Sequence, residues 1–239
     1  MSEDTAKLWG LVPAAGIGKR MSSSIPKQYM NLLGKSVLEH SVQCLFAHPQ
    51  IVGVMVVVAA DDGYWPGVAA KLPSQKLLTT VGAEERYLSV FRGLVALQQK
   101  AQPQDWVLVH DAVRPCLTMS DLERLITQVM PHPVGGLLGS RVNDTLKRSD
   151  DQGIVISTVD RTNIWQAYTP QMFRFEILLK ALQEVIAHQQ IVTDDASAVE
   201  LLGEPVLMVQ GRQDNIKITQ AEDLLWAERI LQHAHWSRF

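Results

Sequence analysis

Strand and helix signals alternate along almost the whole chain, and this alternation limits the possible folds most strongly. Short apolar runs predict buried strands at residues 8–12, 52–59, 77–81, 106–109, 134–138 and 206–209. Apolar residues at helical spacing predict helices at 36–46, 84–99, 173–188 and 195–202, with others beginning near 120 and 219. Such alternation is typical of a parallel sheet between helices. We therefore expect an α/β fold: a Rossmann-like, mostly parallel sheet with helices on both faces.

Three of the expected helices begin with a hydroxyl residue followed three residues later by a glutamate. This pattern is the capping box, in which each side chain bonds the backbone amide of the other residue. The three pairs are Ser36 and Glu39, Ser120 and Glu123, and Thr219 and Glu222. A chain of 239 residues is ample for one large domain and shows no dividing linker, so residues 1–239 are expected to form a single domain.

One segment departs from the alternation. Residues 143–148 and 154–159 flank a turn-rich stretch at 149–153, which predicts a β-hairpin. The first limb is polar and would pack poorly inside a sheet. The hairpin is then either a solvated loop at the rim or a protruding arm that reaches a second subunit, because an isolated two-stranded ribbon is only marginally stable in water.

Composition and charge narrow the classes of partner. The formal net charge of −3 does not favour a nucleic-acid surface, which would be basic. The polar N-terminus does not resemble a signal peptide, and the longest apolar run, at 51–60, is too short to span a bilayer. Cys44 and Cys116 form no paired motif, which favours reduced thiols in the core. We expect a cytoplasmic protein that contacts neither membranes nor nucleic acids.

A loop of small residues follows the first expected strand. Residues 13–18 read Pro-Ala-Ala-Gly-Ile-Gly, and the cations Lys19, Arg20 and Lys27 come next. Small residues let a ligand lie against the backbone, and exposed amides in such a turn can bind an anion. The loop matches neither the P-loop nor the dinucleotide fingerprint, because Arg20 and Met21 occupy positions that those motifs reserve. It is either a nucleotide loop of another kind or a plain surface turn.

Polar clusters follow two further strands, at the sheet edge where ligands bind in such folds. Asp111 comes after the strand at 106–109; it could hold Mg²⁺ or cap a helix. Arg114 is a candidate for an anionic substrate group, whereas His110 is best explained as a packed strand-end residue. Arg86 follows the strand at 77–81, and the residues alone favour an ordinary surface charge there.

These segments carry a resemblance. Residues 12–21 and the Pro-Lys-Gln-Tyr run at 26–29 are similar to the opening signature of the 2-C-methyl-D-erythritol 4-phosphate cytidylyltransferases, in the nucleotidyltransferase superfamily. The likeness continues through 82–90, 110–115, 169–171, 193–198 and 215–219, which covers nearly the whole chain. The chain departs at Ala83, where the family usually has glycine. A backbone contact tolerates alanine there if φ stays negative.

The resemblance implies a set of site residues. The implied catalytic residues are Arg20, Lys27 and Lys217. The implied nucleotide-binding residues are Pro13, Ala14, Ala15, Gly16, Gly18, Lys19, Gly82, Ala83, Ser89, Asp111 and Ala112. The implied residues for the sugar phosphate are Arg114, Thr145, Arg161, Thr169 and Thr193, with Thr145 and Arg161 reaching it from a partner subunit. Either Thr193 or Asp194 also suits an N-cap.

The implied reaction transfers CMP from CTP to 2-C-methyl-D-erythritol 4-phosphate, with Mg²⁺ as cofactor and Asp111 as its candidate ligand. The resemblance also implies a homodimer formed through the arm at 140–163. Transfer to another polyol phosphate, such as ribitol 5-phosphate, stays open, because the nucleotide loop does not touch the acceptor. A non-catalytic nucleotide-binding module also stays open, whereas the missing third glycine disfavours an NAD-dependent oxidoreductase.

Overall fold

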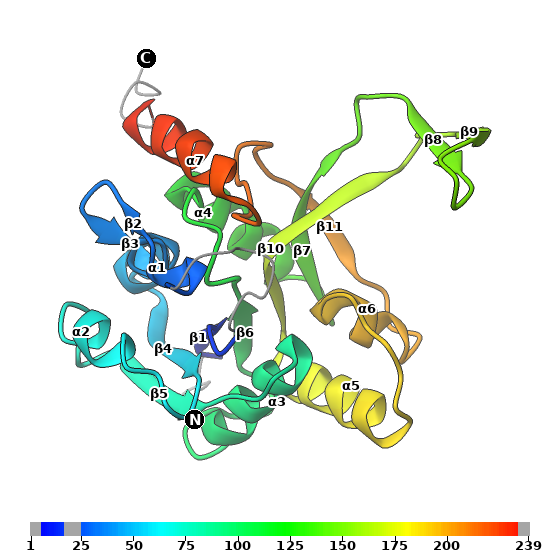
Figure 1. The fold of residues 1–239 in the computed structure, drawn as a ribbon. Helices are drawn as coiled ribbons and strands as arrows, with labels where there is room; N and C mark the ends of the chain where they lie inside the picture. Colours follow the sequence, from blue (N-terminus) through cyan, green and yellow to red (C-terminus); the bar gives the residue numbers. More distant parts are fainter. Residues whose placement is uncertain (1–5, 17–24, 234–239) are drawn as a thin grey trace.

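The computed structural model describes residues 6–16 and 25–233, and its centre is a seven-stranded sheet (Figure 1). In spatial order the strands are β11 (Leu207–Gln210), β7 (Gly135–Arg141), β10 (Trp165–Arg174), β6 (Trp106–Val109), β1 (Leu8–Pro13), β4 (Ile51–Val58) and β5 (Leu77–Val81). All neighbours pair in parallel except β10, which runs antiparallel to both β6 and β7. The mostly parallel sheet is therefore confirmed.

Both faces of the sheet are buried by helices. Strand β1 shows why: Leu8 and Val12 pack into one hydrophobic cluster, and Trp9 and Leu11 pack into a second one. Successive side chains of a strand point to opposite faces, so a strand covered on both sides must be apolar throughout. The first cluster holds α1 (Val37–Ala47), α2 (Trp65–Ala69) and α4 (Met119–Val129). The second holds α3 (Arg86–Leu97), α5 (Phe175–Ala187) and α6 (Asp195–Glu200).

A third, smaller cluster attaches the C-terminal helix, α7 (Ala221–His233), to the body. Ala227 of this helix is fully buried beside Ile218 and Val37. Leu32 in the same cluster belongs to a short antiparallel pair, β2 (Asn31–Leu32) and β3 (Lys35–Ser36). This packing fixes the segment before α7, which carries Lys217.

Strand β10 corrects the expectation for residues 173–188. The helix begins only at Phe175, and Phe173 and Arg174 end a strand that the sequence pattern did not reveal. Pro170 lies inside this strand, and a proline normally argues against a central strand because it cannot donate to the ladder. The register between β10 and β7 shifts between Ala167 and Gln171, so the irregularity falls where the proline lies.

The capping boxes have three different outcomes. The box at Ser36 is confirmed, with Glu39 bonding the Ser36 amide and Ser36 accepting from the Glu39 amide. The prediction at Ser120 is wrong, because α4 begins at Met119 and its cap is Thr118, which accepts from the Asp121 amide. Two hydroxyl residues lie two positions apart there, and sequence spacing selected the wrong one.

The start of α7 also differs from the expected box. Asp223, and not Glu222, accepts hydrogen bonds from the amides of Thr219 and Gln220 and from the Thr219 hydroxyl. The acid thus lies one residue later than the pattern predicts. Its bonds still tie the start of α7 to the segment that precedes it.

The predicted hairpin is present as β8 (Leu146–Ser149) paired antiparallel with β9 (Val155–Val159). Figure 1 shows this ribbon projecting from the body, beyond the far end of the long pair formed by β7 and β10. Ile154, Val155 and Ile156 on the ribbon each expose more than half of their side-chain surface. Such apolar exposure on a thin ribbon is a feature that a contact with another protein would bury.

The two cysteines are free, as expected: Cys116 is buried and Cys44 is partly buried. Burial raises the pKa of Cys44 to about 11 and, together with the nearby charge of Asp214, that of Cys116 to about 12. Both thiols therefore stay protonated near neutral pH. Among the described residues, no helix has the length and apolar character needed to cross a membrane.

The corrected cap of α4 gives a stability prediction. Thr118→Ala removes the acceptor of the Asp121 amide and should lower the free energy of unfolding by about 1 kcal/mol. Ser120→Ala is the matched control, because its hydroxyl contacts Thr118 and no helix amide. Urea unfolding of both variants measures the difference, and a larger loss in the Ser120 variant would contradict the assignment.

Candidate active site

A cavity of about 550 Å³ opens at the carboxyl ends of β1, β5 and β6. The small-residue loop, the start of α3, the end of β6 and the segment before α7 surround it. Its lining residues are Pro13, Ala14, Ala15, Gly16, Lys27, Gln28, Glu84, Arg86, Ser89, Asp111, Ala112, Val113, Lys217 and Thr219. Lys27 and Lys217, both predicted for the site, line this same cavity although 190 residues separate them in the chain.

The small-residue loop is held in place by Gln28. The Gln28 amide nitrogen donates to the carbonyl oxygens of Ala14 at 2.9 Å and Gly16 at 3.0 Å. The backbone N–H of Ala14 donates to Val57, so this amide continues the strand ladder and is not available to an anion. Gln28 directly follows Lys27, so the same contact fixes the lysine beside the loop.

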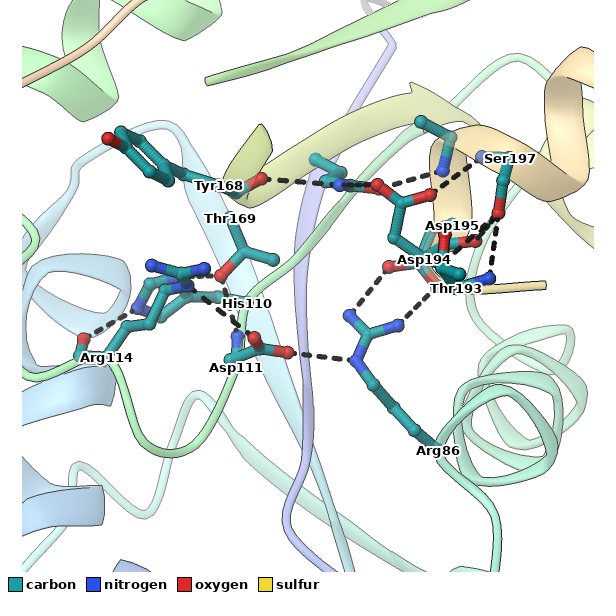
Figure 2. A network of polar contacts seen from close by, with 12 residues as sticks. Arg86, His110, Asp111, Arg114, Tyr168, Thr169, Thr193, Asp194, Asp195 and Ser197 are labelled. Carbon is teal, nitrogen blue, oxygen red and sulfur yellow. Dashed lines mark hydrogen bonds and ion pairs between the residues drawn. The ribbon is translucent and has the colours of Figure 1, made fainter. Parts of the chain in front are cut away.

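Asp111 is the charged centre of the site (Figure 2). Its carboxylate lies 2.9 Å from Arg86 Nε, 2.9 Å from Lys217 Nζ and 3.6 Å from Arg114 Nε. Burial opposes ionisation of Asp111, but the charges of Arg86, Lys217 and Arg114 outweigh it and hold its pKa well below the usual value. Asp111 is therefore an anion that keeps three cations together, and it is no helix cap.

Arg86 joins two carboxylates from different parts of the chain. Its Nε bonds Asp111, and its two terminal nitrogens bond Asp195 at 3.1 and 2.8 Å (Figure 2). This two-pronged contact is the strong arginine–carboxylate geometry. Burial raises the pKa of Asp195, and the nearby carboxylates of Asp111 and Asp194 raise it further. The charge of Arg86 acts in the opposite direction but does not cancel the rise. The expectation that Arg86 is an ordinary surface charge is wrong.

Strand β10 supports Asp111 from the opposite side. Thr169 Oγ1 accepts from the Asp111 amide at 3.0 Å and bonds His110 Nδ1 at 3.0 Å (Figure 2). His110 is fully buried, as expected for a packed strand-end histidine, and burial lowers its pKa to about 4, so it is neutral near pH 7. Gln171 extends the support, because its side chain bonds Asp194 Oδ2 and the amide of Ala196 at the start of α6.

Arg114 and Asn215 fix the segment that carries Lys217. Arg114 donates to the backbone oxygen of Asn215 at 2.7 Å, and the Asn215 side chain donates to the Thr169 carbonyl at 2.9 Å. Both residues are buried. Lys27 Nζ reaches the carbonyl of Ile218 at 3.2 Å, so the two lysine-bearing segments also contact each other.

The turn after β5 packs directly against the small-residue loop. A Cβ placed on Gly82 would lie 2.6 Å from the Ala15 side chain and 2.7 Å from Ser89 Oγ, so only glycine fits there. Ser89 Oγ bonds both the amide and the carbonyl of Ala83 at 3.0 Å. Ala83 is not among the described residues with positive φ, so alanine is compatible with this turn.

Other residues predicted for the site lie elsewhere. Arg114 and Thr169 stand behind Asp111 and do not line the cavity, and Thr193 is exposed just before α6. Asp194, and not Thr193, caps that helix by accepting from the Ser197 amide. Thr145 and Arg161 are exposed on the arm, where Arg161 bonds the carbonyl of Asn143. The predicted residues Gly18, Lys19 and Arg20 lie outside the described part of the chain.

Comparison with known proteins gives one family. The family model described as IspD, 2-C-methyl-D-erythritol 4-phosphate cytidylyltransferase, matches residues 8–233. The chain belongs to this family. A relative of that name from Pseudomonas putida strain GB-1 is 49% identical over 219 residues, covering 91% of this chain and 93% of the relative.

Solved structures agree with the family match. A crystal structure of 4-diphosphocytidyl-2C-methyl-D-erythritol synthase has a TM-score of 0.83 and 36% identity, covering 95% of this chain and 99% of its own. The crystal structure of 2-C-methyl-D-erythritol 4-phosphate cytidylyltransferase from Francisella tularensis has a TM-score of 0.80 and 33% identity. It covers 94% of this chain and 100% of its own. The α/β fold expected from the sequence is that of these family structures.

Three residues that hold the site together, Gln28, Asp195 and Asn215, were not recognised from the sequence alone. Gln28 lies in the run at 26–29, Asp195 in the segment at 193–198 and Asn215 in the segment at 215–219, and the sequence assigns none of the three a role. A signal existed for each, since all three stand inside segments that resemble the family. The sequence does not show which residues contact each other, because Asp195 and its partner Arg86 lie 109 positions apart in the chain.

The contact between Arg86 and Asp195 gives a testable prediction. Asp195→Asn keeps the shape of the side chain but leaves Arg86 without this buried charged partner, which should cost about 3 kcal/mol of unfolding free energy. Asp151→Asn, at an exposed position of the arm turn, is the control and should change stability by less than about 0.5 kcal/mol. Equal losses in urea unfolding would contradict a special role for Asp195.

Proposed function

We propose that this protein transfers the cytidylyl group of CTP to 2-C-methyl-D-erythritol 4-phosphate, giving 4-diphosphocytidyl-2-C-methyl-D-erythritol and pyrophosphate. This step supplies precursors of isoprenoids by the non-mevalonate route. The observation that carries the proposal is the cavity itself, where Lys27, Arg86 and Lys217 face the small-residue loop. The family match names this reaction, and the cavity has the charge that it requires.

The reaction needs positioned cations more than it needs a base. The phosphate of the acceptor has a second pKa near ~6, so its attacking oxygen is largely ionised at neutral pH. This oxygen forms a bond to the α-phosphorus of CTP, and the bond from that phosphorus to the bridging oxygen of pyrophosphate breaks. Negative charge spreads over the phosphoryl oxygens, and fixed cations lower the barrier by stabilising it. Lys27 would hold the α-phosphate, and Arg20 would hold the triphosphate with it.

Lys217 is exposed enough to bind a second anion besides Asp111. In this structure its ammonium lies against Asp111, and its side chain is 39% exposed. A bound phosphate would offer the same charge on the open side of the cavity. We propose that Lys217 binds phosphate oxygens between the two substrates while Asp111 keeps the lysine ammonium in range.

We also propose Mg²⁺ as the cofactor. No cluster of three potential metal ligands occurs among the described residues, so that part of the chain offers no closed cage of protein ligands. This fits Mg²⁺, which often takes one or two carboxylates and completes its shell with substrate phosphates and water. Asp111 is the buried carboxylate that lines the cavity and would hold the ion. When bound, Mg²⁺ would neutralise part of the triphosphate charge.

The arm suggests how the acceptor site is completed. Thr145 and Arg161 are exposed on a projecting ribbon and do not line the cavity of their own chain. We propose that residues 140–163 dock on a second copy, in a cytoplasmic homodimer, where both residues contact the sugar phosphate. The exposed apolar side chains of the ribbon support this proposal, since a dimer contact would bury them.

The decisive experiment on the function measures pyrophosphate release. CTP should give pyrophosphate only when 2-C-methyl-D-erythritol 4-phosphate is present, and ribitol 5-phosphate serves as the competing acceptor. Lys27→Ala should lower kcat by about 10²–10³ because it removes a cation from the reacting phosphate. Lys100→Ala, an exposed lysine outside the cavity lining, is the control. A near-normal rate for the Lys27 variant would refute its role.

If the arm completes the site of the partner subunit, two defective variants should restore activity to each other when they are combined. Arg161→Ala should chiefly raise the KM for the sugar phosphate, whereas Arg148→Ala, also exposed on the arm, should not. If the arm acts in trans, coexpressed Lys27→Ala and Arg161→Ala chains form mixed dimers with one intact site each. At low acceptor concentration the mixture should then recover about a quarter of normal activity. No recovery, with mixed dimers verified by two affinity tags, would place Arg161 in its own subunit's site.

A further inference from the structure

Tyr29 makes a short contact that no step of the proposed reaction uses. Its hydroxyl donates to Asp62 Oδ2 at 2.6 Å, although the two residues lie 33 positions apart. Its ring is buried and stacks on Tyr64, with the ring centroids 5.2 Å apart and the planes inclined by 19°. A hydroxyl donating to a carboxylate at this distance is a charge-assisted hydrogen bond, one of the stronger kinds in proteins. We call the contact between Tyr29 and Asp62 the tyrosine latch.

The receiving side of the tyrosine latch is itself fixed. The other oxygen of Asp62, Oδ1, accepts from the amides of Tyr64 and Trp65, both at 3.1 Å. Trp65 begins α2 and is buried in the core. Asp62 lies in the turn between β4 and α2, so the latch connects Tyr29 to the segment that begins α2. Burial, and then the hydrogen bond and charge of Asp62, raise the pKa of Tyr29, which keeps its hydroxyl protonated as the donor.

The latch lies next to a catalytic residue. Tyr29 ends the 3₁₀ helix η1 (Lys27–Tyr29), whose first residue is Lys27. Single 3₁₀ turns have poor hydrogen-bond geometry and little stability of their own. The position of η1 must therefore come from its tertiary contacts, which include the Gln28 bonds to the small-residue loop and the tyrosine latch.

Two anchors on successive residues have complementary effects on Lys27. Gln28 ties η1 to the side of the cavity where the nucleotide would lie, and Tyr29 ties it to the turn between β4 and α2. The two bonds of Gln28 hold only the loop side of the turn, and the latch adds a contact on the side of Asp62. With both anchors the turn has a fixed orientation, and the Lys27 stem enters the cavity at a fixed angle. Reacting groups need such precision, since a displacement of about 1 Å can cost about 10²-fold in rate.

We infer that Asp62 and Tyr29 form a positioning pair that holds Lys27 in register with the reacting phosphate. The inference rests on the proposed function, because it assigns the pair to the lysine of that reaction. Neither residue would touch substrate; both would act through the orientation of η1. The pair should therefore affect turnover more than nucleotide affinity.

The test removes only the hydroxyl that makes the bond. Tyr29→Phe keeps the stacked ring, and Tyr64→Phe is the matched control, because it removes a hydroxyl for which the described residues provide no partner. Steady-state pyrophosphate release should show kcat lowered at least about tenfold in Tyr29→Phe, with little change in the KM for CTP. Tyr64→Phe should match the wild type. Asp62→Asn keeps an oxygen for the amides of Tyr64 and Trp65 but replaces the charged acceptor of the Tyr29 hydroxyl with an amide NH2, so it should lower kcat in the same direction and by less.

A double-mutant cycle separates positioning from general stability. In a Lys27→Ala background, Tyr29→Phe should have almost no further effect on kcat, because the group that it positions is gone. An equal loss in both backgrounds would overturn the inference, and so would an unchanged kcat in Tyr29→Phe. A drop in activity that follows only the folded fraction, measured by thermal unfolding, would overturn it too. An inactive wild type would instead refute the proposed function, so the two failures are distinguishable.

Discussion

The carboxylate of Asp111 is the charge on which the order of the site depends. Arg86, Arg114 and Lys217 come from three different segments, and their like charges would repel one another if Asp111 were removed. The cost of burying this anion is offset only because all three cations contact it. A polyphosphate is an anion like the Asp111 carboxylate, so it can attract the exposed Lys217 while the buried ion pairs of Asp111 with Arg86 and Arg114 stay in place.

The reversed strand β10 makes this arrangement possible. In a purely parallel sheet, the strand beside β6 would bring its own carboxyl end to the cavity edge. Because β10 runs the opposite way, its middle passes the end of β6, where Thr169 bonds the Asp111 amide and Gln171 reaches the start of α6. The carboxylates at 111 and 195 are thereby held at the distance that one arginine can bridge.

Local patterns predicted what depends on local physics, and missed what depends on long-range contacts. The alternating strands, the Ser36 cap and the hairpin follow from neighbouring residues and were predicted correctly. Strand β10 was missed because Pro170 opposes a central strand, and the cap at Thr118 was missed because two hydroxyls compete. The family resemblance assigned Lys27 and Lys217 to one site, and both line the cavity. Arg86 was expected to be a surface charge, because the sequence does not show that Asp195 lies beside it in the fold.

The arm is not a loop attached to the surface. Its base is the pair of β7 and β10, joined where Arg141 faces Trp165, and β10 then runs on to Thr169, although its pairing with β7 shifts register between Ala167 and Gln171. The base of the arm and the support of Asp111 therefore belong to the same strand. A molecule bound to the ribbon would thus hold a segment that is joined, through a few residues of backbone, to the hydroxyl that fixes the Asp111 amide.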